Sequence, residues 1–186
     1  MATTEDESRQ APYLAGLFHA TKRSVTTVKL PISGQVVMVS TMLRDERSWT
    51  GPRPTSFGDV PNKPALQFND QPIWAEFILV RLLEGDGWQG AWVKNWNGRE
   101  FLRDIRETVE LPSTASALFR RIEKRTAGRG GGCWDIFAWR GDDFLFIESK
   151  QHGQDKLQLT QRTWLESARE EGVPLSSFAI VEWQKR

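Results

Sequence analysis

With 186 residues, the chain is long enough to bury a sizeable core in one domain. Its formal net charge of +1 excludes a strongly polybasic nucleic-acid binder, although it leaves room for a local basic patch. The single cysteine, Cys133, cannot form an internal disulfide and no apolar run is long enough to span a bilayer, so we expect a soluble, cytoplasmic protein without membrane contact.

The first third of the chain is predicted to form a small β appendage. Residues 1–12 are polar and are expected to be a disordered tail. The β-branched stretch Ser24–Leu43 predicts two strands around a turn at Pro31–Gly34. Pro and Gly are dense from Thr50 to Pro64, which indicates a linker. We therefore divide the chain into residues 1–64, the tail, hairpin appendage and linker, and residues 65–186, the larger domain.

The next elements alternate between helix and strand. Pro72 suits the first turn of a helix that ends at Gly85, and the short aromatic segment that begins at Gly87 predicts a strand. A second helix is expected over Ser113–Arg125, ahead of the glycine run Gly130–Gly132.

Two apolar runs, a helix and a strand complete the chain. The runs flank Gly141-Asp142 and predict a β-hairpin. The helix is expected to begin after Thr160 as its N-cap and to stop at Gly172, and the last strand begins at Ser176. This order predicts an α/β fold in which helices flank both faces of a mixed central sheet.

The hairpin carries charged residues where a buried strand should not. If Gly141 occupies the first central position of a type II′ turn, Asp135 lies directly opposite Glu148, with Cβ atoms about 4.5–5.5 Å apart. Strand alternation returns Lys150 to the same face. Two repelling carboxylates beside one ammonium group would suit a hard divalent cation such as Mg²⁺.

Two simpler interpretations of the hairpin stay open. A longer turn would shift the register and make Asp135 and Glu148 diagonal neighbours. An E-x-K triplet also arises easily by chance, and a structural salt bridge from Lys150 to either acid would be ordinary. Likewise, Gln161 lies in the first turn of the following helix and, by itself, could be a solvated polar residue.

Glu76 adds a third carboxylate. On a helix from Pro72 to Glu84 it falls in the apolar sector, where an unpaired charge needs a partner or a metal. The alternative is an ordinary partner such as Arg81, or a side chain that reaches solvent.

Together these residues resemble the PD-(D/E)xK nucleases, and in particular their virus-type replication-repair (VRR-NUC) branch. That branch reads approximately Gly-x-Pro-Asp-Leu, then Glu-Val-Lys-Gly, then Asp-x-Leu-Ser-x-x-Gln-x-x-Trp-Leu and a closing glycine. The present chain reads G-C-W-D-I-F, then F-I-E-S-K-Q, then D-K-L-Q-L-T-Q-R-T-W-L and E-G-V. The similarity covers Pro72 to Arg186, and it implies a restriction-endonuclease-like core.

The resemblance implies a metal-dependent active site. Asp135, Glu148 and the main-chain carbonyl of Ser149 would hold Mg²⁺ or Mn²⁺, and Glu76 would hold a second metal or fix water and the lysine. Lys150 would orient or deprotonate the attacking water and offset the developing negative charge.

The family pattern also gives Gln161 a role in bracing the site or touching the phosphate. Three features depart from the pattern: Trp134 stands in place of a proline, Gln151 in place of a glycine, and Asn97–Gly130 is longer than a minimal core needs. No charged catalytic group is lost.

The expected function is that of a Mg²⁺-dependent deoxyribonuclease, an endonuclease of the restriction or the repair and replication type. A basic run precedes the hairpin and consists of Arg120, Arg121, Lys124, Arg125 and Arg129. These side chains could bind DNA phosphates, or they could form a solvated helix face. The balanced charge suggests modest or structure-selective affinity for duplex, branched or single-stranded DNA, or affinity supplied by a homodimer or a partner. The alternatives are a catalytically silent nucleic-acid-binding scaffold and a protein-interaction role through the Ser24–Leu43 hairpin.

Overall fold

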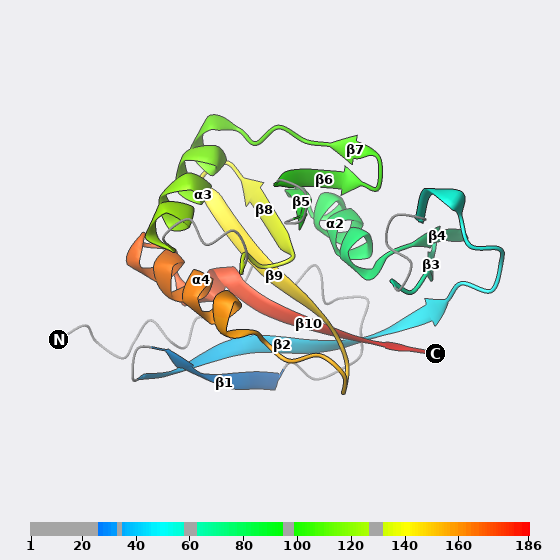
Figure 1. The fold of residues 1–186 in the computed structure, drawn as a ribbon, viewed down its shortest axis with the longest axis horizontal. Helices are drawn as coiled ribbons and strands as arrows, with labels where there is room; N and C mark the ends of the chain where they lie inside the picture. The colour runs from blue at the N-terminus through cyan, green and yellow to red at the C-terminus, as the bar shows by residue number, and fades with distance from the viewer. Residues whose placement is uncertain (1–25, 33–34, 58–62, 95–98, 127–131) are drawn as a thin grey trace.

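A ten-stranded mixed sheet forms the centre of the protein (Figure 1). The computed structural model describes residues 26–32, 35–57, 63–94, 99–126 and 132–186. In chain order the elements are β1 (Thr26–Ile32), β2 (Gln35–Ser48), η2 (Thr55–Phe57), β3 (Leu66–Phe68), β4 (Gln71–Ile73), α2 (Ala75–Gly85), β5 (Gln89–Lys94), β6 (Glu100–Asp104), β7 (Glu107–Thr108), α3 (Ser113–Arg125), β8 (Ile136–Arg140), β9 (Asp143–Gln151), α4 (Leu159–Glu170), η3 (Leu175–Ser177) and β10 (Phe178–Lys185). The strand order is β4-β3-β2-β10-β9-β8-β5-β6-β7, and β1 pairs with β2 beside this path. The predicted fold class is confirmed.

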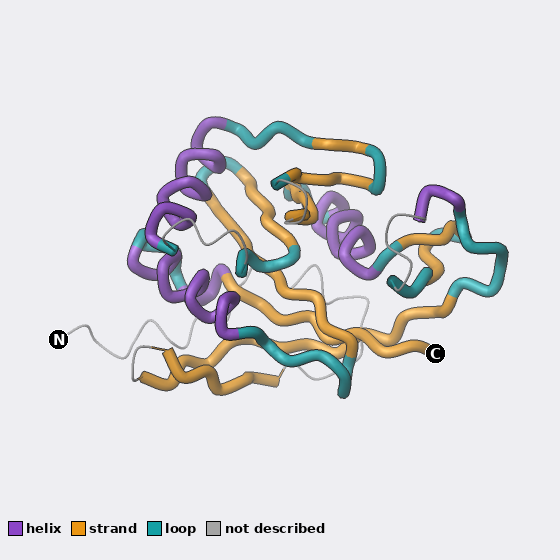
Figure 2. Tube along the Cα trace, viewed as in Figure 1, coloured by secondary structure: helices purple, strands orange, loops and turns teal. Residues whose placement is uncertain are grey.

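The β8–β9 hairpin lies at the centre of the sheet, and its two faces carry separate cores. Phe137 and Phe146 pack with α3 and α4 on one face. Ile136 and Ile147 pack with α2 on the other face. Because side chains alternate along a strand, a hairpin buried on both faces must be apolar at nearly every position. Figure 2 shows the helices placed around the strands in this way.

The N-terminal hairpin is part of the same sheet. The predicted strands of Ser24–Leu43 correspond to β1 and β2, and β2 runs parallel to β10 from Ser40 opposite Ala179 to Glu46 opposite Lys185. Leu30 and Val39 are fully buried in the core beneath α3 and α4. The sheet therefore continues across the division at residue 64, and that division stays a prediction about domains. The predicted disordered tail lies outside the described residues.

The start of the first helix was predicted wrongly. Pro72 lies in strand β4 rather than in a helical turn, and α2 begins at Ala75. Strands β3 and β4 form a hairpin around Asn69 and Asp70, whose φ values of 49° and 59° suit a two-residue type I′ turn. A proline is tolerated there because β4 lies at the edge of the sheet.

Two other boundaries also differ from the prediction. The long Asn97–Gly130 segment contains the short strands β6 and β7 before α3, which itself has the predicted bounds. The N-cap of α4 is Gln158 and not Thr160, because the side-chain oxygen of Gln161 accepts a hydrogen bond from the Gln158 amide at 2.8 Å.

The stop at Gly172 is confirmed. Its φ of 87° and the bond from the Val173 amide to the Ala168 carbonyl close α4 in a Schellman motif. In the described part of the chain, no helix combines the length and the apolar character that crossing a membrane requires.

Candidate active site

The register of the β8–β9 hairpin places the two predicted acids at the same end of the sheet. Arg140 pairs with Asp143 and Ile136 pairs with Ile147, so the turn has two residues and Asp135, just before β8, faces Glu148. Gly141 has a φ of 59°, as the first central position of a type II′ turn requires. The predicted turn and register are confirmed.

Each of the two acids accepts a hydrogen bond from a backbone amide of the facing segment. The Asp135 amide donates to Oε2 of Glu148 at 3.2 Å, and the Ser149 amide donates to Oδ2 of Asp135 at 3.1 Å. These bonds continue the pairing of the two strands after the β8 ladder has ended. They hold both carboxylates at fixed positions beside the strand end.

Glu148 is the centre of the cluster. Its side chain is 1% exposed, and its Oε1 lies 2.7 Å from Nζ of Lys150 and accepts a bond from Nε2 of Gln161 at 2.5 Å. The Gln161 oxygen is at the same time bonded to the N-cap of α4. The glutamine therefore joins the first turn of α4 to the acid of β9, and the interpretation as a purely solvated residue is excluded.

The segment before β8 holds the start of α4 close to the acids. The Trp134 indole donates to the main-chain carbonyl of Gln161 at 3.0 Å, and its ring packs edge-on against Phe178. A Cβ atom on Gly132 would lie 2.5 Å from the carbonyl oxygen of Thr160, so only glycine permits this approach. The tryptophan that replaces the family's proline thus has a structural role of its own.

Both acids are harder to ionise than usual. Burial raises the pKa of Glu148 well above 4.5, and the charge of Asp135 raises it further, while Lys150 opposes the shift. Loss of hydration and then the charge of Glu76 raise the pKa of Asp135 above 3.8, while Lys63 and Lys150 oppose this. The neighbouring lysines therefore do not balance the two carboxylates, and a bound cation would reduce the repulsion between them.

Glu76 lies in the first turn of α2 and is 8% exposed. Its ion-pair partner is Lys63, with Nζ 2.8 Å from Oε1. Arg81 binds Glu84 and Asp104 instead, and Lys150 binds Glu148. Arg81 is therefore not the partner of Glu76, and Lys63 is the ordinary ion-pair partner instead. That Glu76 holds a second metal, or fixes water and Lys150, stays a prediction.

Lys63 was missed by the sequence analysis. It stands in the V-P-N-K-P part of the predicted linker, where no periodicity or motif distinguishes it from a solvated lysine. Only the folded chain brings it to Glu76, and no signal in the sequence could have found it.

The donor set suits a hard divalent cation. Mg²⁺ is commonly held by one or two carboxylates together with waters and substrate oxygens, and Asp135 and Glu148 supply two carboxylates. The N–H and C=O of one strand residue point to the same side, so the Ser149 carbonyl lies on the side where its amide meets Asp135. Among the described residues, no group of three or more Asp, Glu, His or Cys forms a ready metal cage, so water or substrate oxygens would have to complete the coordination.

The basic run lies mostly away from these acids. Arg121 and Arg125 form ion pairs with Glu171, and Arg125 also with Glu170, at the C-terminal end of α4. Gln161 lies in the first turn of that helix, and ten residues of helix span about 15 Å. Arg120 and Lys124 are exposed, and Arg129 lies outside the described residues. A contact between this run and DNA stays a prediction.

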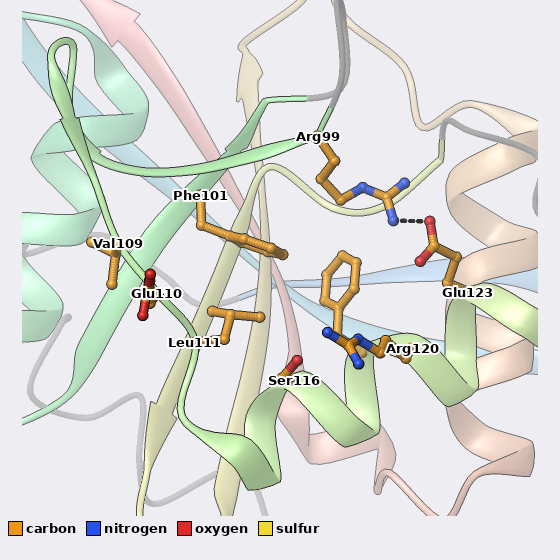
Figure 3. A pocket seen from close by; sticks show the side chains of 9 residues that line it. Arg99, Phe101, Val109, Glu110, Leu111, Ser116, Arg120 and Glu123 are labelled. Atoms are coloured by element: carbon orange, nitrogen blue, oxygen red, sulfur yellow. Dashed lines mark hydrogen bonds and ion pairs between the residues drawn. The ribbon is translucent and has the colours of Figure 1, made fainter.

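The described residues form hollows on the surface, including two that differ in whether they border the acid cluster. One of about 450 Å³ lies between α3 and the β6 region, where Phe101, Leu111 and Arg120 face it (Figure 3). It includes none of the predicted catalytic residues. The other, of about 240 Å³, is lined in part by Lys63, Glu76 and Ser149, and so lies beside the acid cluster.

A comparison with protein families gives a match over more than half of the chain. The family model described as the VRR-NUC domain matches residues 74–178, from the residue before α2 to the first residue of β10. This stretch contains Glu76, Asp135, Glu148, Lys150 and Gln161 and excludes Lys63. No curated protein and no solved structure matches the chain.

Proposed function

This chain belongs to the VRR-NUC domain family and is a nuclease-family protein, and on that premise we propose that it is a metal-dependent endonuclease that hydrolyses phosphodiester bonds in DNA. The observation that carries the proposal is the hydrogen-bonded cluster of Asp135, Glu148, Lys150 and Gln161. Residues from strand β9, from the position just before β8 and from the first turn of α4 converge there on the buried carboxylate of Glu148.

Asp135, Glu148 and the Ser149 carbonyl would hold the Mg²⁺ or Mn²⁺ ion, with Glu76 beside them. A bound ion would supply Lewis-acid chemistry, namely a polarised phosphoryl oxygen and a lowered pKa for bound water. Gln161 supports this role because its amide fixes the orientation of Glu148 from a rigid helix terminus.

Lys150 is the residue that acts on the nucleophile and the phosphate. Its Nζ lies 2.7 Å from Oε1 of Glu148, and its side chain is 13% exposed. The ammonium is therefore held in place but can be reached from solvent. From there it can orient the attacking water and offset the negative charge that develops on the phosphoryl oxygens. Glu148 prevents the ammonium from swinging away.

The test is incubation of supercoiled plasmid with the protein in Mg²⁺, in Mn²⁺ and in EDTA. Lys150→Ala should lower the nicking rate by about 10²–10⁴-fold, the usual contribution of a positioned acid–base group. Lys185→Ala, which removes an exposed lysine at the end of β10, is the matched control and should nick like the wild type. Equal rates for the wild type and Lys150→Ala would show that the cleavage does not come from this site.

Further substrates separate the alternatives. Branched DNA, single-stranded DNA and RNA of the same sequence should be compared with the plasmid under the same metal conditions. Absence of cleavage of every substrate, together with retained DNA binding, would favour the catalytically silent scaffold instead.

A further inference from the structure

Lys63 is a lysine of the active-site region that the matched family segment does not include. Its Nζ lies 2.8 Å from Oε1 of Glu76. The same nitrogen lies 4.0 Å from the centre of the Trp92 ring and 5.1 Å from that of Trp74. A carboxylate and two indole faces therefore hold one ammonium group, and its side chain is 23% exposed.

The charge of Lys63 acts on the acid cluster as well as on Glu76. Asp135 is affected by the negative charge of Glu76 and, in the opposite sense, by the positive charge of Lys63. Lys63 and Glu76 also line the same small hollow as Ser149, whose carbonyl is a candidate metal ligand. The ammonium thus lies within electrostatic range of the place where a divalent cation would bind.

An unpaired carboxylate at the buried position of Glu76 would be costly, so the metal-free protein needs a cation there. The binding of a second, stronger cation to the same cluster would meet repulsion from the ammonium. The two effects have opposite signs: the ammonium of Lys63 would stabilise the metal-free fold and would disfavour the metal-bound state.

We propose that Lys63 is a positioning residue that takes the place of a cation beside Glu76 in the metal-free protein and weakens metal binding at the neighbouring acids. The inference rests on the proposed metal-dependent nuclease function. It assigns to the N-terminal third of the chain a part in setting the metal affinity of the site. If Glu76 were to bind a metal, the two indoles would keep the ammonium close to the site.

A merely structural salt bridge leads to a different expectation. If Lys63 only supported the fold, its neutralisation would loosen α2 and leave metal binding unchanged or weaker. If it competes with the metal, neutralisation lowers the stability of the metal-free protein and strengthens metal binding. Metal affinity therefore distinguishes the two roles independently of nuclease activity.

The experiment is calorimetric titration of the full chain with Mn²⁺, paired with thermal unfolding in EDTA, for the wild type, Lys63→Met and Lys63→Arg. Lys63→Met should unfold at a lower temperature in EDTA and bind Mn²⁺ more tightly, on the order of tenfold for the removal of one nearby like charge. Lys63→Arg keeps the charge and should keep the wild-type affinity. Arg81→Met is the matched control. It removes a cation that lies in α2, as Glu76 does, and that is 26% exposed and paired with Glu84 and Asp104 rather than with Glu76.

Lys63→Gln guards against a variant that fails to fold, since its amide can still donate to Glu76 without a charge. It should also bind Mn²⁺ more tightly than the wild type. Unchanged or weaker Mn²⁺ binding by the neutral variants, with clear binding by the wild type, overturns the inference alone. If the wild type binds no Mn²⁺, the proposed metal-dependent function and the inference both fail.

Discussion

Glu148 is the residue on which the contacts of the site converge. One oxygen accepts from Lys150 and Gln161, and the other accepts from the Asp135 amide. A carboxylate that is 1% exposed requires such partners, because burial of an unpaired charge is expensive. These partners do not fully offset the cost of ionising Glu148, because burial and the charge of Asp135 still raise its pKa above the ordinary value.

This raised pKa predicts how the stability of the metal-free protein depends on pH. The folded state binds the Glu148 proton more tightly than the unfolded state, so stability is lost as pH rises from the ordinary pKa of 4.5 through the folded-state pKa. We expect the unfolding temperature in EDTA to fall over this range. Glu148→Gln, which carries no charge to bury, should flatten the decline, as scanning calorimetry at a series of pH values will measure.

The part of the same pH series below 4.5 provides the control for this prediction. The pKa of Glu84 is lowered by its bonds to Arg103 and Arg81, against the opposing effect of burial, and that of Glu171 is lowered by Arg125. Their contribution is lost as pH falls below 4.5, and Glu148→Gln should not change it. An equal decline above 4.5 in the wild type and the variant would show that Glu148 does not carry the effect.

At the scale of elements, the site depends on how closely the first turn of α4 approaches the start of β8. Gly132 allows the approach, and the indole of Trp134 bonds the Gln161 carbonyl. The helix thereby presents the Gln161 amide to Glu148. The resemblance to the family indicated that Gln161 belongs to the site, but the contribution of Trp134 depends on a bond between segments 27 residues apart.

Trp134→Phe is expected to separate this hydrogen bond from aromatic packing. The variant keeps a ring against Phe178 and loses the bond to Gln161, which should lower the free energy of unfolding by about 1 kcal/mol and reduce nicking. Trp164→Phe is the matched control, because that buried indole nitrogen has no hydrogen-bond partner among the described residues. Urea unfolding and plasmid nicking should both show a larger loss for Trp134→Phe; equal losses would assign the effect to packing alone.

At the scale of the whole molecule, the N-terminal third is joined to the nuclease-like part by strand pairing. Strand β2 lies beside β10 over seven paired positions, from Ala179 to Lys185 on the β10 side. The same third supplies Lys63 to the acid cluster. On its other side β10 pairs in parallel with β9, the strand that carries Glu148 and Lys150. Because β10 is held between β2 and β9, the pairing with β2 helps to keep the strand beside the site in place.

Removal of residues 1–64 should therefore destabilise the remainder. The fragment 65–186 would expose the edge of β10 along its length, and we expect it to lack the cooperative urea transition of the full chain when followed by circular dichroism. Deletion of residues 1–25, which removes none of the described strand pairs, is the control and should keep that transition. Cooperative folding of the fragment would instead support the predicted division at residue 64.

The sequence by itself determined the features that depend on neighbours in the chain. Turn chemistry at Gly141 and strand alternation were sufficient to place Asp135 opposite Glu148 with Lys150 on the same face. Helix α3 and the stop of α4 at Gly172 also follow from local patterns, because helical periodicity and left-handed glycine are local properties.

Only the tertiary structure decided which distant segments meet. The pairing of β2 with β10 and the ion pair of Lys63 with Glu76 join parts of the chain whose own patterns do not name their partners. The family resemblance suggested the neighbourhood of Gln161 and Glu148, but their contact also belongs to the fold. The physical reason is that strand edges and ion pairs specify a kind of partner, while the packing of the whole core selects which partner lies within reach.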